Sequence, residues 1–381
     1  MREAGPGAWQ SFPLMTALTI VALVGGLVCL VAGAELLVRG AASIATRLGI
    51  APVIIGLTVV AFGTSAPELA VSVSAGFRDS GDVAFGTVAG SNIVNILLIL
   101  GGSAVVGTLA VTQRIIRIDI PLLIGASLLA LALSLDNQIG RLDGVLLFAG
   151  IVAYTGWLIR SARNERAEVL EEYDEAVEEL EVEVVDQPLP VQVGLVLVGL
   201  VVLVAGSQLL VGSATDIAED LGVSDLVIGL TVVAVGTSLP ELATSLLAAL
   251  RGQRDIAVGN VVGSNLFNLL CVLGLTGIVS PSPSPVADSS LQVDIPVMLA
   301  ATVVLVPIIW KGFVIQRWEG LVLMAFYALY VTFLVLDAGD SEAVDVVGPL
   351  ALVVTPLVVL GFTLAGLQAR RLHRQAGAAQ P

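Results

Sequence analysis

The sequence predicts an all-α polytopic membrane protein whose two halves are inverted repeats of each other. Apolar residues make up 56% of its 381 positions and charged residues only 13%, whereas a soluble domain is about half apolar and about a quarter charged. The apolar residues fall into runs of about 20, the length at which a helix spans a bilayer. One of these runs recurs almost unchanged in the second half of the chain.

Eleven apolar runs are long enough to cross a membrane as helices. A transmembrane β-barrel would show short segments of alternating polarity instead. The first run is too long, and too closely followed by the next, for a cleaved signal peptide. The predicted spans are 14–38, 50–77, 82–109, 118–136, 140–160, 191–215, 223–250, 255–279, 291–310, 317–337 and 345–368.

The positions of Lys and Arg predict how these spans are oriented, because cytoplasmic loops of membrane proteins carry an excess of basic residues. With the N-terminus outside, 14 of the 17 basic residues fall on the cytoplasmic side. Only Arg2, Arg78 and Arg141 fall outside. We therefore expect a multi-pass protein of the plasma (inner) membrane with an external N-terminus and a cytoplasmic C-terminus.

One hydrophilic insertion divides the chain into two halves. The N-terminal half covers 1–160, an acidic cytoplasmic linker 161–190, and the C-terminal half 191–340, while 341–381 holds the eleventh span and a basic tail. Eleven carboxylates fall within 164–187, a composition typical of a solvated linker. A cation-sensing loop is the alternative, although the residue order of an EF-hand is missing.

Composition and charge exclude several classes of function. The net charge of −15 excludes a basic protein that binds nucleic acid or anionic lipid. The single histidine, His373, lies in the tail, which excludes a histidine-based metal site or proton relay in the membrane. Cys29 and Cys271 both lie in apolar runs and are expected to pack there rather than form a disulfide framework.

An internal repeat carries the polar residues of interest. The segment IGLTVVAFGTSAPELA at 55–70 recurs as IGLTVVAVGTSLPELA at 228–243, an offset of 173. Without any gap, 28 of 51 positions are identical between 51–101 and 224–274. Five spans separate the two starting points, so the copies would cross the membrane in opposite directions. Inverted repeats with a substrate site between them are typical of secondary transporters, and duplication for packing alone is the alternative.

Two carboxylates, Glu68 and Glu241, lie inside the second and seventh predicted spans at equivalent positions of the repeat. A charged side chain at that depth costs several kcal/mol unless a partner or an aqueous cavity stabilises it. The interiors of these spans contain no Lys, Arg or His, so a cation from solution is the simplest partner. A protonated glutamate hydrogen-bonded between helices is the alternative.

Oxygen-bearing groups surround each glutamate in the sequence. Thr64 and Ser65 precede Glu68 by four and three residues and share its helix face, and Thr237 and Ser238 repeat this arrangement. A proline directly precedes each glutamate and cannot donate a helical hydrogen bond to the glycine carbonyl four residues before that proline. This predicts backbone carbonyls without helical partners near the middle of the membrane. Carboxylates, hydroxyls and carbonyls are hard donors that suit Ca²⁺ and also Na⁺.

The following span of each half adds one serine and two asparagines after a G-x-x-x-G spacing that allows close helix approach. For the asparagines the alternative role is an interhelical hydrogen bond. These residues are Ser91, Asn92 and Asn95 in the first half and Ser264, Asn265 and Asn268 in the second.

The motifs GTSAPE at 63–68 and GTSLPE at 236–241, each followed by a G-x-x-x-GSN segment, resemble the two α-repeats of the cation/calcium antiporter superfamily. The prokaryotic sodium/calcium exchanger branch is the most similar. The resemblance covers most of residues 14–338 and implies a ten-helix exchanger frame of inverted five-helix repeats, to which the eleventh span is an addition. It also implies that the first and sixth spans slide across the core as gates.

Carried over position by position, the resemblance implies which residues bind the ions. Glu68 and Glu241 would bind calcium together with backbone carbonyls near Thr64 and Thr237. Asn95 and Asn268 match the remaining polar position of the site. The sodium sites would draw on the glutamates and on Ala61, Ser65, Ser91, Ala234, Ser238 and Ser264.

Two positions depart from patterns found in related branches. Some relatives carry Asp at the positions of Asn95 or Asn268, and its absence here weakens the case for potassium dependence. The proton/calcium branch typically has a glutamate where this chain has Gly263 and Ser264, so the resemblance favours Na⁺ over H⁺ as the coupling ion.

The sequence therefore predicts a secondary antiporter, not an enzyme, that exchanges Ca²⁺ for Na⁺, needs no cofactor and binds no nucleic acid. Coupling to H⁺, or transport of Mn²⁺ or another divalent ion, would keep the same fold, although an all-oxygen site disfavours soft metals. An intramembrane hydrolase using Ser65 or Ser238 would lack a base. A membrane scaffold or cation sensor is the alternative outside transport.

Overall fold

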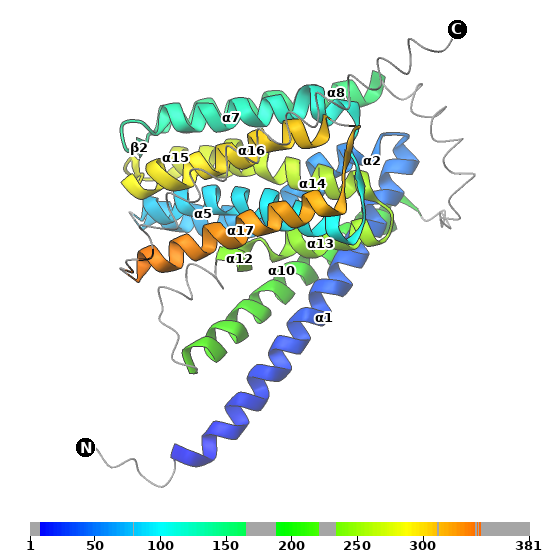
Figure 1. Cartoon of the computed structure of the whole chain (residues 1–381). Coiled ribbons are helices and arrows are strands. Elements are labelled where there is room, and N and C mark those ends of the chain that lie inside the picture. The colour runs from blue at the N-terminus through cyan, green and yellow to red at the C-terminus, as the bar shows by residue number, and fades with distance from the viewer. Residues whose placement is uncertain are drawn as a thin grey trace.

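Long apolar helices make up almost all of the computed structural model (Figure 1). The structure describes residues 8–78, 80–164, 188–220, 234–310 and 312–339, together with Ser341 and Ala343. By length and composition, eight helices of these residues could cross a membrane, and a ninth span is formed by a helix pair that is bent in the middle. The eleventh predicted span and most of the acidic linker lie outside the described residues.

The helices of the first half follow the five predicted spans. The first helix begins earlier and ends later than the 14–38 expected from hydropathy, because its polar ends continue the same helix. The bounds are α1 (Ala8–Leu48), α2 (Pro52–Ile55), the π-helical turn η1 (Gly56–Val60), α3 (Ala61–Thr64), α4 (Ala66–Phe77), α5 (Gly81–Ile93), η2 (Val94–Leu100), α6 (Gly101–Val106), η3 (Ile115–Asp119), α7 (Ile120–Leu133) and α8 (Arg141–Asn164).

The second half repeats this order. The start of the seventh predicted span, 221–233, lies outside the described residues. The bounds are α10 (Leu189–Asp220), α12 (Ala234–Thr237), α13 (Leu239–Leu250), α14 (Arg254–Leu266), η5 (Phe267–Val272), α15 (Leu273–Val279), η6 (Ser290–Asp294), α16 (Ile295–Ile309) and α17 (Arg317–Ala338).

Two short antiparallel ladders join loops of one half to loops of the other. Strand β1 (Leu109–Ala110) pairs with β4 (Val314–Ile315), and β2 (Gln138–Ile139) pairs with β3 (Ser284–Pro285). The two ladders lie at opposite ends of the helices, with β2 at the left of Figure 1. The ladders therefore join the two halves to each other at both ends of the bundle.

Helices α1 and α10 form an antiparallel pair on one face of the bundle (Figure 1). Glycines let their backbones touch: a Cβ at Gly33 would lie 2.6 Å from the backbone nitrogen of Leu203 and 2.8 Å from the carbonyl oxygen of Gly199. Gly26 and Gly206 meet in the same way. Small residues on facing helices allow this close contact in a bilayer.

The remaining helices interlock the two halves around a buried centre. Helix α6 packs on α17 where Gly101 meets Gly320, and α8 packs on α15 where Gly144 meets Gly274. Helix α14 lies between the halves, and every residue from Ile256 to Leu266 is buried. The polar residues predicted as a site therefore lie in the most enclosed part of the molecule.

Candidate cation site

Each predicted glutamate lies just after a break in its helix. Ser65 separates α3 from α4, and the two parts of this span are bent by 46° relative to each other. Ser238 separates α12 from α13 in the same way, with φ −89° and ψ 9° against −81° and 7° at Ser65. A proline in the first turn of the second part accounts for each break. Glu68 and Glu241 thus sit in the first turn of a helix, where the macrodipole favours negative charge.

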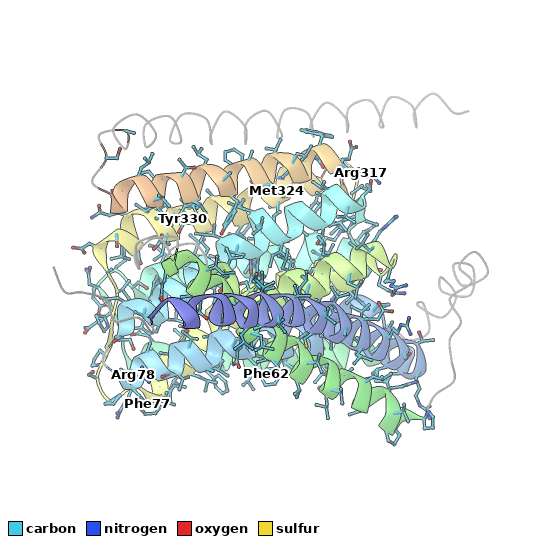
Figure 2. The ribbon with its side chains drawn as sticks, turned by 90° about the horizontal axis from the view of Figure 1, so that it is seen from below. Phe62, Phe77, Arg78, Arg317, Met324 and Tyr330 are labelled. Carbon is cyan, nitrogen blue, oxygen red and sulfur yellow. The ribbon has the colours of Figure 1, made fainter. Side chains whose placement is uncertain are left out.

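The break lies at mid-depth of the bundle. Phe62, one turn before it on α3, lies between the end marked by Arg78 and the opposite end marked by Arg317 (Figure 2). The Phe62 ring packs edge-on against Phe267 of η5, with ring centroids 5.2 Å apart. The end of α3, just before the break, therefore lies away from both ends of the bundle.

The two broken helices exchange hydrogen bonds. The Ser65 hydroxyl donates to Oε1 of Glu241 at 3.0 Å, and the Ser238 hydroxyl donates to Oε1 of Glu68 at 3.0 Å. The Ser91 hydroxyl of α5 also donates to Oε1 of Glu68 at 3.2 Å. Each glutamate is therefore held by the serine of the other half, so both carboxylates belong to one site.

The second oxygen of each carboxylate has no hydrogen-bond partner among the described residues. Both Glu68 and Glu241 are completely buried, and Oε2 of each is left unpaired. Buried polar atoms are almost always satisfied, and a buried carboxylate without a positive partner is costly. These two oxygens are the clearest structural indication of a cation site.

Four asparagines form a hydrogen-bonded chain that joins α5 and η2 of the first half to α14 and η5 of the second. The Asn95 amide donates to Oδ1 of Asn265 at 2.9 Å, and the Asn268 amide donates to Oδ1 of Asn92 at 3.1 Å. The side-chain amides of Asn92 and Asn265 each donate to the other's backbone carbonyl, at 3.3 and 3.4 Å. All four asparagines therefore make the interhelical hydrogen bonds that were the alternative to a role in ion binding. Oδ1 of Asn95 and of Asn268 stays buried and unpaired.

The remaining predicted residues lie close to the carboxylates, with different degrees of enclosure. Thr64 is completely buried, and its hydroxyl is 3.5 Å from that of Ser264 on α14. The carbonyl of Ala61 accepts bonds from the Ser65 backbone at 3.0 Å and from the Thr64 hydroxyl at 3.4 Å. Thr237 is partly exposed at the end of α12, which begins at Ala234.

One expected bare carbonyl is not bare. The sequence predicted that Pro67 and Pro240 free the carbonyls of Gly63 and Gly236. The Gly236 carbonyl instead accepts a bond of 2.8 Å from the Ser207 hydroxyl of α10. The prediction was wrong at this position because a neighbouring helix supplies the donor that the proline removes.

Asn260 is a functional candidate that the repeat comparison did not single out. It is completely buried on α14, accepts a bond from the Thr64 hydroxyl at 3.2 Å and donates to the Ser245 hydroxyl at 2.9 Å. Its repeat equivalent is Thr87, so comparing the two copies hides it. The available signal was its spacing of four from Ser264, which places both on one helix face.

A second pair of membrane carboxylates lies outside this site. Tyr154 donates to Asp119 at 2.9 Å, and Tyr330, labelled in Figure 2, donates to Asp294 at 2.8 Å. Each bond joins the fourth span of a half to its fifth. The sequence signal for this pair was a second repeated motif, IDIP at 118–121 and VDIP at 293–296. It was missed because these two copies are offset by 175 residues rather than by 173.

The donors gathered at the centre are carboxylate, hydroxyl, amide and carbonyl oxygens. No group of three or more His, Cys, Asp or Glu residues that could hold a metal ion is found in the described part of the chain. The site therefore has two carboxyl groups and many neutral oxygens, a set suited to hard cations that enter and leave. It offers no soft ligand for tight retention of a transition metal.

A polytopic helical protein with such a site between two related halves is a membrane transporter of cations. The chain belongs to the sodium/calcium exchanger protein family, whose sequence model matches residues 18–160 and 191–336.

Individual relatives match along most of their length. CaxA, named as an antiporter in Alkalimonas amylolytica, is 42% identical over 319 residues, covering 82% of this chain and 97% of its own. The inner membrane protein YrbG of Escherichia coli is 38% identical over 299 residues, covering 78% and 89%. The solved structure of the sodium-calcium exchanger NCX_Mj, soaked with Na⁺ and Sr²⁺, has a TM-score of 0.69 at 29% identity and covers 83% of this chain and 98% of its own.

Proposed function

We propose that this protein is a secondary active antiporter that exchanges Ca²⁺ for Na⁺ by alternating access. The observation that carries the proposal is the pair of buried glutamates, Glu68 and Glu241, each bonded to serine hydroxyls through one oxygen and left unpaired at the other. A bound cation supplies the positive charge that these oxygens lack. The family assignment and the sodium-calcium exchanger NCX_Mj support the same ions.

The proposed ligands divide by the ion they hold. Glu68 and Glu241 bind Ca²⁺ with the backbone carbonyls near Thr64 and Thr237. Asn95 and Asn268 present their unpaired amide oxygens to the same centre. Sodium ions are held by the glutamates together with Ala61, Ser65, Ser91, Ala234, Ser238 and Ser264.

Charge makes the two ions exclude each other. Two ionised carboxylates balance one Ca²⁺, and the same carboxylates balance Na⁺ ions when Ca²⁺ is absent. Because both ions need the same oxygens, occupancy by one displaces the other, which is the condition for antiport. An empty site leaves buried charge uncompensated, so the empty carrier reorients slowly and Ca²⁺ does not pass alone.

The choice of Na⁺ as coupling ion rests on the absence of further acids. The central helices carry asparagines at 95 and 268 and glycine and serine at 263 and 264. Coupling to H⁺ instead of Na⁺, or transport of Mn²⁺ instead of Ca²⁺, would use the same oxygens. Experiment decides between these alternatives.

We also propose that the protein lies in the inner membrane with its N-terminus outside and its C-terminus in the cytoplasm. The excess of basic residues in alternate loops supports this orientation. The inner-membrane relative YrbG supports the location. In this orientation, inward flow of Na⁺ drives export of Ca²⁺.

The test is Ca²⁺ uptake into proteoliposomes loaded with Na⁺, compared with K⁺-loaded vesicles and with vesicles carrying only a pH gradient. Uptake that requires internal Na⁺ is the expected result. Uptake driven by the pH gradient alone would replace Na⁺ by H⁺ as coupling ion. No Ca²⁺ uptake under any gradient, with Mn²⁺ taken up instead, would overturn the substrate assignment.

A further inference from the structure

An ion pair ties the long helix α1 to the end of the broken span of the other half. Oε2 of Glu35 lies 2.9 Å from Nη2 and 3.0 Å from Nε of Arg251, which directly follows α13. Oε1 of Glu35 pairs with Arg39 on its own helix. The Glu35 side chain is only 20% exposed, whereas Arg251 is 55% exposed. This contact lies well away from the cation site and is not required to hold an ion.

The repeat offset shows that the ion pair exists in one half only. Adding 173 to Glu35 gives Gln208 on α10, and subtracting 173 from Arg251 gives Arg78 directly after α4. The arginine is thus present in both copies, but its carboxylate partner is replaced by a neutral amide in the second. The carboxylate is therefore missing at the repeat-equivalent position of α10.

The two arginines lie on opposite faces of the membrane. Five spans, an odd number, end between Arg78 and Arg251: the spans of α5, α7, α8 and α10 and the broken span ending in α13. Figure 2 shows Arg78 at the end of the bundle opposite to Arg317. We call these the Arg78 face and the Arg251 face. In the proposed orientation the Arg251 face is cytoplasmic.

The packing of the long helices differs between the two faces. Helix α1 packs closely along α13 towards the Arg251 face, while the equivalent packing of α10 on α4 is slight. In Figure 1, α1 and α10 diverge from the other helices towards the N-terminal end of α1. Two repeats of such similar sequence thus adopt different arrangements. If each repeat took the arrangement of the other, α10 would pack on α4 and α1 would leave α13. This is the opposite state of the transport cycle, open at the Arg251 face.

We propose that Glu35 and Arg251 are positioning residues that form a one-sided latch, which favours the state closed at the Arg251 face and sets a difference in apparent Ca²⁺ affinity between the two membrane faces. In the opposite state, Gln208 meets Arg78 without a charge of its own. The latch therefore stabilises one end of the transport cycle, and the repeat-equivalent pair at the other end lacks the carboxylate. This inference rests on the alternating access of the proposed function.

The expected size follows from the kind of contact. A half-exposed ion pair shifts an equilibrium by roughly two- to fivefold. A ligand that binds only one state has its apparent affinity reduced by the fraction of carriers in that state. The latch therefore raises the KM for Ca²⁺ at the Arg251 face relative to the Arg78 face by this factor.

The first variant is Glu35→Gln, which installs in α1 the residue that α10 already carries. The second is Gln208→Glu, which installs the mirror latch opposite Arg78. Both should lower the ratio of the KM at the Arg251 face to the KM at the Arg78 face by roughly two- to fivefold, and together they should lower it further. Arg39→Gln is the matched control, because it removes only the pairing within α1 and should leave the ratio unchanged.

The KM values are measured for Ca²⁺ in right-side-out and inside-out vesicles that contain the full chain. A simple loss of folded protein would lower the maximal rate on both faces and leave the ratio unchanged. An unchanged ratio in both variants, or a rise in it, would overturn the proposal.

Hydrogen–deuterium exchange of residues 246–254 in lipid nanodiscs gives a readout that needs no transport. Release of α1 in Glu35→Gln should speed exchange in this segment, and Arg39→Gln should not change it. Equal exchange in Glu35→Gln and the unaltered protein would overturn the latch whichever ions are carried. Faster exchange in a protein that transports no Ca²⁺ would keep the latch and overturn only the proposed substrate.

Discussion

Ser65 on one broken helix donates its hydroxyl to Glu241 on the other, at 3.0 Å. The mirror bond runs from Ser238 to Glu68 at the same distance. Because each glutamate is held from the opposite half, neither half contains a complete site. In the proposed antiporter, an ion bound at one glutamate would therefore act on the helix break that positions the other.

Replacing Glu68 or Glu241 by Gln should reduce Na⁺-driven Ca²⁺ flux to background, because one charge cannot balance Ca²⁺. The same variants should be at least as resistant to heat as the unaltered protein in buffer without cations, since a buried uncompensated charge is removed. They should also lose the stabilisation that Ca²⁺ gives by binding the folded state. Flux assays and thermal unfolding with and without Ca²⁺ test this, and normal flux in either variant would contradict the proposed site.

Ser65→Ala should raise the KM for Na⁺ by about tenfold, because a hydrogen bond to a charged group contributes roughly 1.5 kcal/mol or more. Ser238→Ala should do the same, given the symmetry of the two bonds. Ser127→Ala is the matched control, since that hydroxyl binds the Leu123 carbonyl of its own helix at 2.8 Å. Equal KM values in Ser65→Ala and the control would argue against a role of the crossed bonds in Na⁺ binding.

Asn265→Ala should destabilise the protein by roughly 1–3 kcal/mol, because it leaves the buried Asn95 amide without its acceptor. Thr302→Val is the control, since the Thr302 hydroxyl bonds to Met298 within its own helix. Chemical unfolding in detergent measures the difference. A stability as high as that of the control would show that the bond between Asn95 and Asn265 does not hold η2 to α14.

Gly33→Val should force α1 and α10 apart, because even a Cβ would lie 2.6 Å from the Leu203 backbone nitrogen. Overpacking of this kind costs roughly 1–3 kcal/mol, and we expect slower exchange as well as lower stability. Gly25→Val is the matched control on the same helix, where a Cβ meets nothing within 4 Å. A similar loss of stability in both variants would mean that helix propensity, and not the contact between α1 and α10, is responsible.

The sequence was most informative where a physical constraint is strong and local. The apolar runs predicted eleven spans, because a bilayer demands about 20 apolar residues in each, and the described helices follow ten of them wholly or in part. Glu68 and Glu241 were found because a carboxylate at that depth requires an explanation. The fold class could thus be predicted, whereas the membership of the candidate site stays a prediction.

The contacts of the site could not be predicted because they depend on tertiary structure. Nothing in the GTSAPE motif indicates that Ser65 reaches Glu241 rather than Glu68, its neighbour on the same helix. The bond from Ser207 to the Gly236 carbonyl depends on where α10 crosses α12. Asn260 was missed because it occurs in one repeat only, and a comparison of repeats detects what they share.

The two ladders between the halves decide which parts of the molecule are free to move. Strands β1 and β4 fasten one end, and β2 and β3 fasten the other, so the third to fifth spans of both halves form a stapled frame. The four bonded asparagines belong to that frame, whereas α1 and α10 do not. In the proposed antiporter, an ion arriving from either side of the membrane would meet the same fixed asparagines, and we expect the preference among ions of different radius to be the same in both directions of transport.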